Sequence, residues 1–148
     1  MRLWHYKLIP YLPKSQLLAQ WRELNSIFKN QPKHILINYV YDYPKIYLAH
    51  YAELVANEML ARGYHIKSWD GYLNYLVKDI SEEEFEQDRR SPHIFNEHDF
   101  NYLTICFYNL LEKYMRGQKD FTDDKWGRLL KFYDNECKKP YSLVFGGF

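Results

Sequence analysis

The side chains that most often carry chemistry are scattered along this chain. None of its six histidines shows the HxxxH or HExxH spacing that brings two imidazoles to one helix face as zinc ligands. The two cysteines, Cys106 and Cys137, show no CxxC spacing, so we interpret them as free thiols in a reducing compartment. No glycine-rich phosphate loop occurs. The scattered histidines therefore favour structural roles, and no metal site is expected from them. The histidines are His5, His34, His50, His65, His93 and His98.

Aromatic residues are unusually frequent, at 19% of the chain, with 15 Tyr, 9 Phe and 4 Trp. For residues such as Trp21 and Phe107 the simplest interpretation is a place in the core. Surface Tyr or Trp side chains would instead be able to stack on unpaired bases. The sequence does not sort the tyrosines between these two roles.

Charge is distributed unevenly behind a formal net charge of +1. Residues 1–67 carry nine Lys or Arg against four Asp or Glu, whereas residues 68–100 carry three against nine. The basic part could meet a polyanion, although a run of charge is also typical of an ordinary solvated face.

Length and composition are those of a globular protein. The 148 residues predict one domain over 1–148, and 26% charged with 47% hydrophobic residues is ordinary for a soluble chain. No apolar run approaches the ~20 residues of a membrane span. The start of the chain, Met1 to His5, lacks a signal-peptide layout. We expect a cytoplasmic monomer without membrane association.

The first helix is predicted to follow Pro13 and to run to about Lys29. A neighbouring polar strip contains Gln16, Gln20 and Glu23, which leaves Glu23 free to face a cleft. The apolar residues at helical spacing are Leu17, Leu18, Trp21, Leu24, Ile27 and Phe28.

Further helix signals follow. Residues 30–41 are expected to form a loop, and a second helix should begin near Pro44 and close at Arg62-Gly63. Ser81 and Glu84 have the spacing of a capping box. Two more helices are expected, one capped by Asn96 and ending near Gly117, the other capped by Thr122. The tail from Lys138 is expected to be irregular. The sequence therefore predicts an all-α, compact helical domain.

Two segments resemble the pyrimidine-dimer DNA glycosylase family. Residues 16–28 contain the aromatic–Arg–Glu–Leu core of that family's first helix, at a similar distance from the N-terminus. Residues 51–67 are similar to its second helix, which also ends in Arg-Gly-aromatic and continues into a polar–Ile–Lys turn. The resemblance is close over residues 1–29 and 46–67, and loose beyond residue 95.

The resemblance implies a glycosylase with AP-lyase activity that uses its N-terminal α-amine as nucleophile. The amine attacks the anomeric carbon of a damaged nucleotide, displaces the base and leaves a Schiff base, after which β-elimination breaks the strand. Met1 would be the nucleophile here, and Glu23 matches the family's catalytic glutamate. α-Amines as a class titrate near 7.7–8.0, so about a tenth or more is neutral at pH 7.

The same resemblance implies damaged double-stranded DNA as partner, with the damaged nucleotide extruded from the duplex. Arg2, Arg22, Lys29 and Lys33 are the expected phosphate contacts. The chain departs from the family in having Arg directly after Met1 and Ser26 where the family has a further Arg. Two other interpretations stay open: a non-catalytic nucleic-acid-binding protein on the same scaffold, and a protein-interaction module that uses the acidic 79–88 segment.

Overall fold

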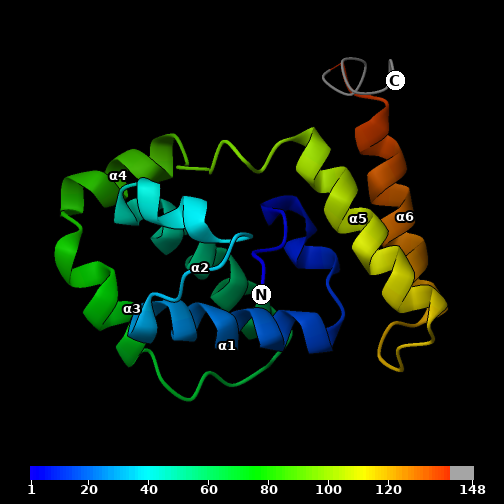
Figure 1. Ribbon diagram of the computed structural model, residues 1–148, viewed down its shortest axis with the longest axis horizontal. Coiled ribbons are helices and arrows are strands. Elements are labelled where there is room, and N and C mark those ends of the chain that lie inside the picture. Colours follow the sequence, from blue (N-terminus) through cyan, green and yellow to red (C-terminus); the bar gives the residue numbers. More distant parts are fainter. Residues whose placement is uncertain (141–148) are drawn as a thin grey trace.

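The computed structural model describes residues 1–140, and every regular element among them is helical (Figure 1). This confirms the all-α expectation. In chain order the elements are the 3-10 helix η1 (Tyr6–Tyr11), α1 (Lys14–Asn30), η2 (Asn38–Asp42), α2 (Lys45–Ala61), α3 (Asp70–Tyr75), η3 (Val77–Asp79), α4 (Glu82–Arg90), α5 (Phe100–Met115) and α6 (Asp123–Cys137).

Helices α1 and α2 form as their sequence signals predict. Each begins directly after a proline, Pro13 or Pro44, whose fixed φ suits a helix start. Helix α2 ends at Ala61. Gly63, just beyond its C-cap, has φ +81°, and the Tyr64 N–H bonds back to the Met59 carbonyl at 2.9 Å. The two helices pack against each other, and α3 packs against α1.

The first residues of the chain lie in the centre of the molecule, between α1 and α2 on one side and the α5–α6 pair on the other (Figure 1). Leu3, Leu8 and Leu12 are at most 1% exposed, so this segment is part of the core. Its burial is what brings the chain's own terminus against the helices.

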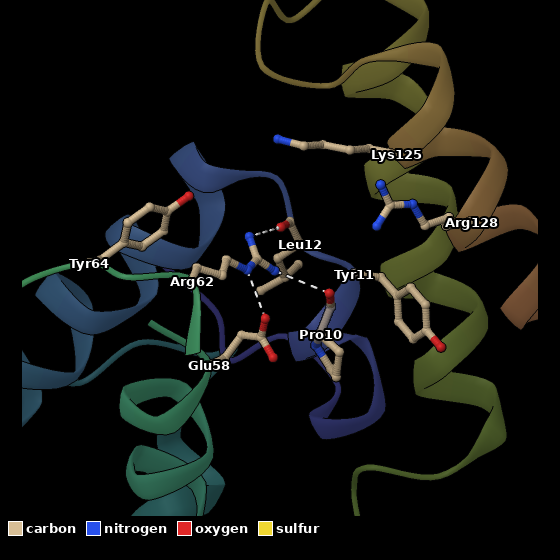
Figure 2. Close-up of a pocket in the computed structure, with 8 residues that line it drawn as sticks. All are labelled: Pro10, Tyr11, Leu12, Glu58, Arg62, Tyr64, Lys125 and Arg128. Atoms are coloured by element: carbon tan, nitrogen blue, oxygen red, sulfur yellow. Dashed lines mark hydrogen bonds and ion pairs between the residues drawn. The ribbon is translucent and has the colours of Figure 1, made fainter. Parts of the chain in front are cut away.

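Arg62 clamps η1 from the end of α2 (Figure 2). Its guanidinium donates to the carbonyls of Leu12 at 2.8 Å and Pro10 at 3.1 Å, and its Nε donates to Glu58 at 2.7 Å. The Arg-Gly pair at residues 62–63 therefore has two structural roles, since the arginine holds η1 and the glycine ends the helix.

The α5–α6 hairpin is packed by rings. Phe107 stacks on Tyr133 with centroids 3.9 Å apart, and Trp126 stacks on Tyr114 at 4.9 Å. Thr122 caps α6 as expected. Helix α5 begins later than expected: Asp99, not Asn96, is the N-cap, because its carboxylate accepts from the Tyr102 N–H at 2.9 Å.

The structure also tests the expectations for the capping box, the two cysteines and the loop after the first helix. The Ser81–Glu84 capping box is confirmed, and both cysteines are free, with Cys106 buried. The loop expected over residues 30–41 is wrong in its last part, because η2 begins at Asn38. Residues 141–148 of the expected irregular tail lie outside the described part. Within residues 1–140 no helix has the length and apolarity needed to cross a membrane.

Candidate active site

The main chain of residues 2–4 is held by polar side chains from three helices. The Trp4 N–H donates to Gln20 Oε1 of α1 at 2.8 Å. The hydroxyl of Tyr51, on α2, lies 2.7 Å from the Trp4 carbonyl, and the hydroxyl of Tyr102, on α5, donates to the Leu3 carbonyl. Each of these contacts is to a backbone atom. Together they fix the positions of the Trp4 N–H and of the Leu3 and Trp4 carbonyls.

Glu23 lies beside this terminus. Its carboxylate accepts from the Arg2 backbone N–H and, at 3.2 Å, from Gln20 Nε2. Partial burial raises the pKa of Glu23, while the positive charge of the Met1 amine, the Arg2 N–H and the Arg22 charge act in the opposite direction. The Met1 residue is 37% exposed, so solvent and ligands reach the end of the chain.

This pairing combines two groups that complement each other chemically. A terminal amine is a nucleophile that can form an imine with a carbonyl or anomeric carbon. Partial burial raises the pKa of a carboxyl, which makes its protonated form more available for proton donation than in an exposed carboxyl. Groups of these two kinds are the ones that covalent and general acid–base catalysis require.

The predicted phosphate contacts fall into two sets. Arg2 is half-buried, with its guanidinium 5.9 Å from the centre of the Tyr102 ring, so it points toward α5. Arg22, Lys29 and Lys33 are exposed and, within residues 1–140, none of them forms a salt bridge. Since Arg22 and Lys29 are seven residues apart on α1, they lie on the same face of that helix.

The buried ring of His98 supports the terminal segment, and the buried ring of His5, which belongs to that segment, packs against the His98 ring. His98 Nδ1 accepts from the Tyr6 N–H at 3.2 Å, so its Nε2 carries the proton and donates to the Tyr39 hydroxyl at 2.8 Å. His5 stacks on His98 with centroids 5.5 Å apart. Burial lowers the pKa of His5 to about 4 and that of His98 to about 3, so both rings are neutral at pH 7.

The remaining histidines give no metal centre. His50 and His93 each place Nδ1 3.0 Å from an oxygen of Asp88, and these contacts, with the His93 N–H, lower the pKa of that carboxyl against its burial. Across the described residues no group of three or more His, Cys, Asp or Glu is arranged to hold a metal ion.

A concavity of about 350 Å³ lies between η1, the end of α2 and α6 (Figure 2). Its cations already have partners in the protein. Arg62 bonds to backbone carbonyls and Glu58, Arg128 pairs with Asp124, and Lys125 donates to the Asp120 carbonyl at 3.3 Å. The cations that line this pocket are therefore already engaged within the protein.

Sequence reasoning missed the residues that hold the terminus. Gln20 was assigned to a polar strip, yet it is 0% exposed. Tyr51, Tyr102 and His98 gave no sequence signal, because their partners are backbone atoms of residues 3–6, far away along the chain.

A comparison of the sequence with models of protein families identifies the family of this chain. The model for pyrimidine dimer DNA glycosylase matches residues 1–78, just over half of the chain. This chain belongs to the pyrimidine dimer DNA glycosylase family. No curated protein and no solved structure matched it.

As a pyrimidine dimer DNA glycosylase family member, the protein belongs among the DNA repair glycosylases, and DNA is its macromolecular partner. The matched region contains Glu23, Gln20 and Tyr51. It ends before His98 and Tyr102, although these two residues also hold the terminal segment.

Proposed function

We propose that this protein is a DNA glycosylase with AP-lyase activity, which acts on pyrimidine-dimer-type lesions through the Met1 amine. Glu23 is the general acid and base, and no metal or organic cofactor takes part. The proposal rests above all on one observation. The Gln20 amide donates to the Arg2 carbonyl at 3.1 Å and to the Glu23 carboxylate at 3.2 Å, so the carboxylate lies beside the residue that follows the proposed nucleophile.

The reaction follows from these two groups. The neutral amine attacks the anomeric carbon of the damaged nucleotide, and the base departs with the electrons of the glycosidic bond. Loss of an amine proton and opening of the sugar ring give a protonated Schiff base, with Glu23 delivering a proton to the ring oxygen. Glu23 then removes a proton from the adjacent sugar carbon, and β-elimination expels the 3′ phosphate and breaks the strand.

Burial of Glu23 suits both of its steps. A carboxyl of ordinary pKa is almost fully ionised at pH 7 and donates protons poorly. The raised pKa of Glu23 brings its protonated form closer to working pH, and the Met1 charge limits how far it rises. Once the amine has become part of the Schiff base, a positive charge remains beside the carboxylate during proton removal.

DNA contact is assigned to Arg2, Arg22, Lys29 and Lys33. Three of these side chains are exposed on α1 and on the loop after it, where they can neutralise phosphates. Arg2, which follows the nucleophile, would hold the phosphate nearest the attacked sugar. Replacing Arg22 by Ala should reduce the salt dependence of DNA affinity by about one unit of slope, as measured by fluorescence anisotropy. Lys131→Ala, which removes an exposed cation on α6, is the matched control and should leave the slope unchanged.

The test uses duplex DNA with one abasic site, which removes the question of lesion choice. Native-terminus protein is mixed with this DNA and a borohydride reductant, and the product is weighed and mapped by mass spectrometry. We expect a covalent adduct on Met1 that is absent when the terminus is acetylated. Glu23→Gln should slow strand cleavage by about 10²- to 10⁴-fold. Glu83→Gln, which removes an exposed carboxylate on α4, is the matched control.

Binding without an adduct, in native and acetylated protein alike, would contradict the proposal and support a non-catalytic DNA-binding role. An adduct on a lysine would contradict the assignment of Met1. Absence of any salt-dependent DNA binding would favour the protein-interaction alternative. Dimer-containing DNA then tests the lesion, because cleavage of one glycosidic bond before strand cleavage is specific to the glycosylase step, and the freed base stays attached to its dimer partner.

A further inference from the structure

Gln20 is the most completely used polar side chain near the terminus. It is 0% exposed, on the α1 face that packs against residues 2–4. Its Oε1 accepts from the Trp4 N–H at 2.8 Å and lies 2.7 Å from the Tyr51 hydroxyl. Its Nε2 donates to the Arg2 carbonyl at 3.1 Å and to Glu23 at 3.2 Å. Both protons of the amide are therefore used, and its oxygen has two donors within reach.

The direction of this amide is determined by its backbone partners. The Trp4 N–H can only donate and the Arg2 carbonyl can only accept, so oxygen must face Trp4 and nitrogen must face Arg2. The second proton on that nitrogen is then aimed at the Glu23 carboxylate. A carboxylate and a peptide carbonyl, both acceptors, are thus joined through a single NH₂ group.

This bridge connects the two reacting groups of the proposed chemistry. Arg2 directly follows Met1. Its N–H belongs to the Met1–Arg2 peptide and its carbonyl to the Arg2–Leu3 peptide, so contacts to both atoms hold the backbone next to the amine. Gln20 holds the carbonyl and one oxygen of Glu23, while the Arg2 N–H contacts the same carboxylate. The separation of amine and carboxylate is therefore set through one buried side chain.

We propose that Gln20 is a positioning residue that holds the Glu23 carboxylate beside the N-terminal amine, with the Tyr51 hydroxyl fixing the amide. This inference rests on the proposed function for its kinetic consequence, but the geometry it describes can be tested separately. Gln20 touches no substrate in this role and acts only through Glu23 and the main chain of Arg2.

The informative substitution is Gln20→Glu, which keeps the size of the side chain but replaces the NH₂ group by an acceptor. The new carboxylate repels Glu23 and the Arg2 carbonyl, so it should release Glu23 from its position and raise its pKa further. Gln16→Glu is the matched control, because it makes the same change one turn earlier on α1. There the amide pairs with Gln118 at 2.7 Å, away from the terminus.

Single-turnover cleavage of abasic duplex DNA is measured across pH, with DNA affinity measured separately. We expect Gln20→Glu to slow cleavage by about 10- to 100-fold with unchanged affinity, and to move the pH–rate profile to higher pH. Gln16→Glu should match the wild type. Tyr51→Phe removes a hydroxyl whose single proton is within reach of both the amide oxygen and the Trp4 carbonyl, and it should give a smaller loss. Thermal melts establish that each variant is folded.

An unchanged rate and pH profile in folded Gln20→Glu would overturn the proposal. So would an equal loss of rate in Gln16→Glu, since that would indicate a general effect of charge on α1. The titration of Glu23, followed by NMR in the absence of DNA, supplies a readout independent of activity. A pKa of Glu23 that rises in Gln20→Glu but not in Gln16→Glu supports the positioning role even if wild-type protein forms no Schiff base. An unmoved pKa refutes it.

Discussion

The terminal segment and the α5–α6 hairpin both contribute side chains to the core, but they are held by different forces. The backbone of residues 2–6 is fixed by hydrogen bonds with the side chains of Gln20, Tyr51, Tyr102 and His98. The hairpin is held by stacked rings, among them Phe107 on Tyr133.

The two regions differ in how precisely their contacts locate individual atoms. Hydrogen bonds depend on distance and direction, so they define where individual atoms lie. Ring packing contributes more free energy per residue and depends less on direction. The segment proposed to react is therefore the one held by directional contacts, and the hairpin supplies stability around it.

The largest expected effect concerns the hairpin. Phe107→Ala removes a ring that stacks on Tyr133 and Trp126, and it should lower the free energy of unfolding by about 3–5 kcal/mol. Urea denaturation measures the loss. The rate of adduct formation per folded molecule should stay unchanged. A lower rate in the folded fraction would show that the two regions are not separable.

A pH effect should appear in the terminal region. The pKa values of His5 and His98 are about 4 and about 3 when folded, against about 6.5 when unfolded. The stability that both provide is therefore fully present above pH 6.5 and is lost as pH falls toward 4. Each histidine contributes a slope of up to about 1.4 kcal/mol per pH unit. Urea denaturation between pH 7 and 4.5 should be less pH-dependent in His98→Gln than in His65→Gln, whose histidine is exposed.

A smaller effect is expected from Tyr102→Phe. This change leaves the Leu3 carbonyl without its donor and should cost about 1–3 kcal/mol of stability. Because Leu3 lies two residues from the amine, Schiff-base formation should also slow, whereas Tyr108→Phe on the exposed face of α5 should alter neither property. If both variants behave alike in thermal melts and borohydride trapping, the terminus is held without Tyr102.

The smallest effect should come from the surface of the hairpin. Arg128 and Asp124 form an ion pair with side chains 70% and 76% exposed. Asp124→Asn should change stability by less than about 1 kcal/mol, because solvent screens such pairs. A larger change in thermal denaturation would mean that charge on α6 contributes to the hairpin beyond its ring packing.

Prediction from the sequence succeeded where the signal is local. The apolar spacing between Pro13 and Lys29 and the Arg62-Gly63 ending are read within one helix, and both helices formed accordingly. Glu23 was predicted to be the catalytic glutamate because it lies in a short contiguous motif that resembles the family's first helix. Whether all 148 residues form one domain stays a prediction, as do the roles of Met1 and Glu23.

Gln20 shows why the rest was not accessible. Helical spacing placed it beside Gln16 and Glu23 on a polar strip, and that strip is covered by residues 2–4 only in the folded chain. Main-chain partners have no side-chain signature, so nothing in the sequence marks where they will lie. The same holds for His98, which bonds the Tyr6 N–H from 92 positions away.

The contacts from His98 and Tyr102 to the terminal segment carry a consequence for evolution. The family signature ends at residue 78, yet two of the side chains that secure the start of the chain come after it. The matched region and the structural support for the terminus therefore differ in extent in this molecule. A shortened gene product ending at residue 78 would retain every residue of the signature and still lose part of the support for its own first residues. Substitutions after residue 78 of this chain are accordingly able to alter how its terminus is held without changing the matched region.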